Sequence, residues 1–90
     1  MARFTDKQGQ YRAFIRAYTL IHRQAPAEAD MQRFFRVTPP TVHRMVVELE
    51  ARGLITRTPG APRSIQLALH PDEIPPLREP EPVTSPVGEH

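Results

Sequence analysis

The sequence predicts a mainly α (α+β) domain, a three-helix winged helix-turn-helix whose C-terminal wing is a two-stranded β-hairpin. Two observations predict this class. Up to Gly53, apolar residues recur at helical spacing in three segments, and only a few residues separate the second segment from the third. After Gly53 they alternate along two short segments joined by a proline- and glycine-containing turn. We therefore assign residues 1–70 to one domain and residues 71–90 to a tail.

The first helix is predicted over residues 6–24. Thr5-Asp6-Lys7-Gln8 has the pattern of a capping box, in which Thr5 caps the helix and Gln8 bonds back to it. Pro26 ends the helix, because the residue before a proline avoids the α region. The inward stripe is expected to contain Tyr11, Phe14, Ile15, Tyr18 and Ile21. The outer face carries Arg12, Arg16 and Arg23, which we expect to be solvated.

A second, short helix is predicted from Pro26 or Ala27 to about Arg36. Glu28 and Asp30 fall in its first turn, where carboxylates suit the helix dipole. Its inward residues are Ala27, Met31, Phe34 and Phe35. We interpret the aromatic residues of both helices as core rather than as a base-stacking platform, because they fall on inward stripes.

The third helix, over residues 39–52, is marked at both ends. Thr38 is placed as the N-cap with its hydroxyl accepting from a backbone N–H, and Pro39 falls at the first helical position. Gly53 supplies the left-handed residue that closes the helix. One face carries a buried stripe of Val42, Met45, Val46 and Leu49. The other face, which could lie in a DNA major groove, carries Thr41, Arg44, Val47 and Glu48, with His43 on its flank.

Residues 54–58 and 63–69 are predicted as the two strands of the hairpin, and Pro59-Gly60-Ala61-Pro62 as its turn. Ile65, Leu67 and Leu69 alternate onto one side of the second strand. The hairpin must pack on the helices, because an isolated hairpin is unstable. Its tip presents Arg57 and Arg63.

The formal charge of +2 conceals an uneven distribution. Residues 1–70 hold eleven basic and five acidic residues, whereas residues 71–90 hold one basic and five acidic residues. A basic body favours nucleic acid as a partner if its charges cluster on one face. The tail also holds six of the eleven prolines, which is typical of a disordered segment, although Ile74-Pro75-Pro76-Leu77 could dock locally.

Composition and motifs disfavour several other classes of protein. The chain has no cysteine, which excludes disulfides and fits a reducing cytoplasm. No apolar run approaches the ~20 residues of a membrane span, and the N-terminus lacks the apolar region of a signal peptide. The histidines have no metal-binding spacing, and there is no phosphate-binding loop, HExxH motif or cysteine nucleophile. We therefore expect a cytoplasmic protein that is not an enzyme and has no cofactor or metal.

The chain resembles the N-terminal DNA-binding domain of the LexA repressors over about residues 4–69. The matching features are Thr5-Asp6-Lys7-Gln8, Thr38-Pro39, Leu49-Glu50-Ala51-Arg52-Gly53-Leu54-Ile55 and Gly60-Ala61-Pro62-Arg63-Ser64-Ile65, in the same order and spacing. The helix start Val37-Thr38-Pro39-Pro40 also resembles that of short stand-alone bacterial relatives of this family. The resemblance implies a bacterial, repressor-like transcriptional regulator that binds duplex DNA with its third helix in the major groove.

Carried over by position, Pro40, Thr41, His43 and Arg44 fall where that family's base-reading side chains lie. The family's well-known repressors have an Asn and two acids in this set, so their operator sequence is not expected to apply here. The turn before the third helix is one residue shorter, with Arg36 where a glycine is usual. LexA repressors continue into a self-cleaving, dimerising Ser/Lys peptidase domain, and because this chain ends at His90, neither activity is expected to carry over.

We assign the reading of bases to Pro40, Thr41, His43, Arg44 and Val47, and contacts with the DNA backbone to Arg36, Thr38, Arg57 and Arg63. Plainer interpretations stay open. Arg44 could bind a phosphate or be a solvated side chain, and His43 could be a plain exposed histidine. Thr41 could bond within its own helical turn, and the two wing arginines could merely solubilise the hairpin.

Three wider alternatives also stay open. Winged helices are reused as protein–protein interaction modules, although the polar and cationic reading face favours DNA. Specific DNA binding would normally need a homodimer or a partner protein, and the first helix or the tail could supply the contact surface. The acids of the tail could also fold back on the basic body and compete with DNA.

Overall fold

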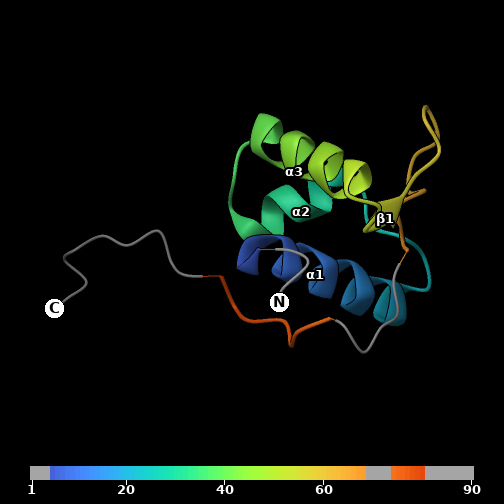
Figure 1. The fold of residues 1–90 in the computed structure, drawn as a ribbon. Helices are drawn as coiled ribbons and strands as arrows, with labels where there is room; N and C mark the ends of the chain where they lie inside the picture. Colours follow the sequence, from blue (N-terminus) through green and yellow to red (C-terminus); the bar gives the residue numbers. More distant parts are fainter. Residues whose placement is uncertain (1–4, 69–73, 81–90) are drawn as a thin grey trace, which may run out of the picture.

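The computed structural model describes residues 5–68 and 74–80. In chain order its elements are α1 (Asp6–His22), α2 (Glu28–Phe35), α3 (Pro39–Ala51), β1 (Ile55–Thr56) and β2 (Gln66–Leu67). Figure 1 shows α2 between α1 and α3, with the hairpin projecting beyond the end of α3. The three helices followed by an antiparallel hairpin confirm the predicted class, a mainly α winged helix-turn-helix.

α1 begins as predicted. The Gln8 N–H donates to Thr5 Oγ1 at 3.1 Å, and the Thr5 N–H donates to Gln8 Oε1 at 3.0 Å, which together form the predicted capping box. The helix ends at His22 because Arg23 adopts a left-handed conformation with φ 60°.

Two predictions about the faces of α1 were wrong. Ile21, expected on the inward stripe, is 74% exposed, because the last turn of the helix lies beyond the part that the core covers. Arg12, expected on a solvated face, is fully buried. All residues from Gln8 to Ile15 are buried, so this half of α1 has no face towards solvent. β2 and residues 74–80 pack against the helix in addition to the other helices, which explains why a simple two-sided pattern failed.

The turn between α2 and α3 depends on a left-handed residue. Arg36 has φ 57°, a conformation that favours glycine, and it redirects the chain from α2 into α3. Thr38 occupies the N-cap position, but its hydroxyl pairs with the Thr41 hydroxyl at 2.9 Å and not with a backbone N–H as predicted. Pro39 opens α3, and Gly53 with φ 72° follows its end, both as predicted.

The hairpin has the predicted position but shorter strands. Ile55 lies opposite Leu67 and Thr56 opposite Gln66 in the antiparallel register. Beyond Thr56 the side chain of Ser64 replaces the backbone pairing, because its hydroxyl accepts from the Thr58 N–H at 2.9 Å. Leu69, expected to end the second strand, lies outside the described residues.

The core lies between the three helices and the hairpin. Tyr11 of α1 stacks on Phe35 of α2 with ring centroids 4.1 Å apart, and Phe14 packs against Phe34 at 4.8 Å. The aromatic residues are therefore core, as predicted. The fully packed cluster contains Tyr11, Phe14, Ile15, Met31, Val42, Val46, Leu49, Leu54, Ile55 and Ile65.

Residues 74–80, which we call the strap, run along α1 (Figure 1). Ile74 is buried and Leu77 packs against the core. The Gln10 side chain fixes the strap at two points, donating to the Pro76 carbonyl at 3.0 Å and accepting from the Arg78 N–H at 2.7 Å. The predicted local docking of residues 74–77 is thus confirmed. Arg78, in the part of the tail predicted to be disordered, is also bonded to α1, and residues 71–73 and 81–90 lie outside the described residues.

Candidate nucleic-acid interface

The outward face of α3 brings together four of the five predicted base-reading residues. Pro40, His43, Arg44 and Val47 are all exposed, and their spacing of three or four residues places them on one side of the helix. Among the described residues, no ion pair involves Arg44. The face therefore offers a guanidinium, an imidazole and two small apolar side chains.

Thr41, the fifth predicted base-reading residue, lies apart from this group. Its side chain is half-buried and its hydroxyl is paired with that of Thr38. It lines a groove of about 400 Å³ between α1, α3 and the end of the strap, together with Tyr11, Met45 and Pro80. Thr41 is therefore at the edge of the outward face, on the side towards α1.

The start of α3 offers no free backbone donors in its first four residues. Pro39 and Pro40 have no N–H, and the N–H groups of Thr41 and Val42 both donate to the Thr38 carbonyl, at 3.0 and 3.2 Å. An anion at this end of the helix would therefore depend on side chains. Arg36 and Thr38, the two residues predicted to contact the DNA backbone here, are both exposed.

Arg57 on the wing is held by carboxylates of two helices. Its Nε donates to Glu50 Oε1 of α3 at 2.9 Å, and its Nη1 lies 3.8 Å from Glu28 Oε2 of α2. Only 26% of its side chain is exposed. The structure thus gives this arginine an internal role that the sequence did not predict, as a link from the wing to α2 and α3.

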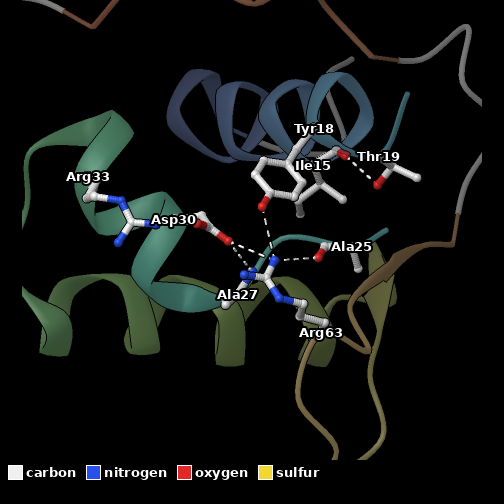
Figure 2. Close-up of polar contacts among 8 residues, drawn as sticks. All are labelled: Ile15, Tyr18, Thr19, Ala25, Ala27, Asp30, Arg33 and Arg63. Carbon is white, nitrogen blue, oxygen red and sulfur yellow. Dashed lines mark hydrogen bonds and ion pairs between the residues drawn. The ribbon is translucent and has the colours of Figure 1, made fainter. Parts of the chain in front are cut away.

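Arg63 turns from the wing towards the body of the protein, as Figure 2 shows. Its Nη1 donates to the Tyr18 hydroxyl at 3.0 Å, the Asp30 carboxylate at 3.1 Å and the Ala25 carbonyl at 3.2 Å. Its backbone is left-handed, with φ 54°. We call this set of contacts the wing clasp, because it ties the hairpin to α1, α2 and the loop between them.

Asp30 is the buried centre of the wing clasp. It also accepts from the Ala27 N–H at 2.8 Å, which caps α2, and it pairs with Arg33 (Figure 2). Burial alone would raise the pKa of Asp30. The Ala27 N–H and the positive charges of Arg63 and Arg33 outweigh burial, so the pKa lies below its ordinary value of 3.8.

Sequence reasoning placed Glu28 and Asp30 at the start of a helix but missed their partners. The available signal for Asp30 was its position, three residues after the N-cap Ala27, where a carboxylate can bond back to the cap N–H. No comparable signal exists for Glu28, because its partners His43 and Arg57 come from distant parts of the chain.

Residues 5–68 and 74–80 contain no group of three or more acidic, histidine or cysteine side chains that could hold a metal ion. Across the same residues, we find no helix with the length and apolarity that crossing a membrane requires.

The fold and the exposed third helix define a winged helix-turn-helix domain. Residues 18–61 match the MarR family model, which describes winged-helix domains. Over 74 residues the chain is 35% identical to a LexA repressor of Thermosipho melanesiensis and 34% identical to one of Thermosipho africanus. These alignments cover 82% of this chain and 37% of each relative, so the chain spans little more than a third of the length of these relatives.

Proposed function

We propose that the chain is a sequence-specific double-stranded DNA-binding protein and a repressor-like transcriptional regulator related to the LexA repressors. The observation that carries this proposal is the outward face of α3, where Pro40, His43, Arg44 and Val47 are exposed side by side. An α-helix with such a face fits the major groove, where arginine is bidentate to guanine and apolar groups touch thymine methyls. Both named relatives are repressors, which supports the same proposal.

The proposed contacts fall into two groups. Arg44 and His43 would bond to base edges, Pro40 and Val47 would make apolar contacts, and Thr41 would reach the groove only from its edge. Contacts to phosphates would position the domain without reading sequence. Arg36 and Thr38 are exposed for this task, whereas Arg57 and Arg63 would have to contact phosphate while also bonded to carboxylates.

A second copy of the chain is the proposed source of additional DNA contacts, because one recognition helix reads only a half-site. The exposed pair Leu20 and Ile21 at the end of α1, at 68% and 74% exposure, offers an apolar surface for self-association away from α3. A palindromic binding site would support this arrangement, and its half-site spacing would give the geometry.

The test is selection of random duplex DNA by the purified protein, followed by sequencing and a salt titration on the selected site. One enriched motif would establish sequence-specific binding. Weak binding without a motif, lost near physiological salt, would contradict the proposal, because it would reduce the basic charge to a non-specific footprint. A protein partner would then be sought, as expected of an interaction module.

A further inference from the structure

Three elements of the domain meet at one carboxylate on the edge of the outward face of α3. Glu28 Oε2, in the first turn of α2, lies 3.5 Å from His43 Nδ1 on α3 and 3.8 Å from Arg57 Nη1 on the wing. The Glu28 side chain is 31% exposed and that of His43 is 59% exposed. The imidazole is therefore more exposed to solvent than the carboxylate beside it.

This arrangement distinguishes the two ring nitrogens of His43. A neutral imidazole has one N–H donor and one acceptor nitrogen, and the partner of one nitrogen decides which is which. A carboxylate oxygen beside Nδ1 favours the proton on Nδ1. Nε2 is then left as a hydrogen-bond acceptor on a side chain that is 59% exposed.

We propose that Glu28 is a specificity-determining positioning residue, which orients His43 so that Nε2 accepts a hydrogen bond from a base. In the major groove the bases that donate are adenine through N6 and cytosine through N4. The base opposite His43 should therefore be adenine or cytosine. Guanine and thymine present only acceptors at the corresponding positions, and an acceptor nitrogen facing them would be left unpaired. This inference rests on the proposed DNA-binding function.

The other charged groups around Glu28 allow a matched control. Arg57 also pairs with Glu50, at 2.9 Å, but no ion pair joins Glu50 to His43. Glu28→Gln and Glu50→Gln therefore remove the same charge from the same arginine. Only the first also removes the carboxylate beside the imidazole.

The first measurement reads the His43 ring directly and needs no DNA. The nitrogen chemical shifts of the histidine rings, with the His43 signals assigned by their loss in His43→Ala, report which nitrogen carries the proton when the rings are neutral. We expect the proton on Nδ1 in the natural protein and in Glu50→Gln, and a shift towards Nε2 in Glu28→Gln. A proton on Nε2 in the natural protein, or no change in Glu28→Gln, would overturn the inference.

The second measurement repeats the random-duplex selection with the three variants. We expect one position of the motif to prefer adenine or cytosine, His43→Ala to lose that preference, and Glu28→Gln to weaken it about two- to tenfold, the effect of one hydrogen bond. Glu50→Gln should leave the base preference at that position unchanged. Both Glu28→Gln and Glu50→Gln remove one negative charge, so any general gain in DNA affinity should be the same in the two variants. Thermal melting confirms that each variant is folded.

The outcomes separate this inference from the proposed function. A natural protein that selects no motif contradicts the proposed function, and the base preference inferred from it falls with it. A clear motif whose His43 position prefers guanine or thymine contradicts only the role of Glu28. The same holds if Glu28→Gln and Glu50→Gln change that position equally.

Discussion

Arg44 is the single residue on which base recognition should depend most. It lies exposed on the outward face of α3, and no ion pair with another described residue competes for its guanidinium. We expect Arg44→Ala to cost about 1–3 kcal/mol of binding free energy on the selected site and to relax specificity at one base pair. Selection of random duplex DNA by the Arg44→Ala protein measures this change in specificity. Arg52→Ala, which removes an exposed arginine at the other end of α3, is the control, and an equal loss on all DNA sequences would indicate a phosphate contact instead.

Arg36 combines a backbone conformation suited to glycine with an exposed positive charge. We expect Arg36→Gly to raise the free energy of unfolding by about 0.5–1 kcal/mol, since relief of the left-handed strain exceeds the added freedom of the unfolded chain. The same change should weaken DNA binding and lower the salt slope by about 1, through loss of one phosphate contact. Urea unfolding and a salt titration measure the two effects separately. A destabilised variant would contradict the conformational argument, and an unchanged slope would contradict the contact.

At the scale of elements, the wing clasp should set the position of the hairpin. Asp30→Ala removes both the α2 cap and the partner of Arg63, and we expect it to lower the free energy of unfolding by about 1.5–3 kcal/mol. Arg63→Ala should also destabilise the fold, and the double variant should lose less than the sum of the two, as expected for groups in contact.

The same variants decide the predicted backbone role of Arg63. If its guanidinium also contacts a phosphate, Arg63→Ala will lower the salt slope of DNA binding by about 1, and Asp30→Ala will not. We expect this difference between the two salt slopes, because the sequence assigns Arg63 to the DNA backbone. Equal slopes in the natural protein and both variants would restrict Arg63 to the wing clasp.

The lowered pKa of Asp30 makes the wing clasp sensitive to acid. The folded state favours the ionised form of Asp30. The stability that the ionised carboxylate contributes is therefore fully present above the ordinary pKa of 3.8 and is lost as the pH falls through the lower folded-state pKa. Denaturation curves from about pH 7 to about pH 3 should therefore show less acid destabilisation for Asp30→Asn than for the natural protein. Equal pH dependence of the two proteins would contradict this account.

The elements themselves could be predicted because their signals are local. The capping box at Thr5, the stripe of Val42 and Val46, and Gly53 each depend on residues within one or two helical turns. The same locality explains the failures. Arg12 is buried, and Arg63 bonds to Asp30 and Tyr18, which lie far earlier in the chain. Neither arrangement could be deduced from neighbouring residues.

The candidate site was predictable to the same extent. Helical spacing placed Pro40, His43, Arg44 and Val47 on one face, and the structure agrees. Helical spacing could not show that Glu28 lies beside His43, because that contact requires the packing of α2 against α3. Charge in the wing was likewise visible in the sequence, whereas its pairing with Glu50 and Asp30 was not.

At the scale of the whole molecule, the strap changes how the acidic tail must be tested. Removing residues 69–90 also removes the strap, and the loss of buried Ile74 alone should cost about 1.5–3 kcal/mol of stability.

Removing only residues 81–90 spares the strap and deletes Glu81 and Glu89. If these acids compete with DNA for the basic body, this shorter deletion will tighten non-specific binding at low salt, and the gain will fade as salt screens the charges. Thermal melting and a salt titration of the two truncated chains measure both effects. Unchanged binding by the shorter deletion would leave the acids without a role in competition, and unchanged melting by the longer one would contradict a stabilising role for the strap.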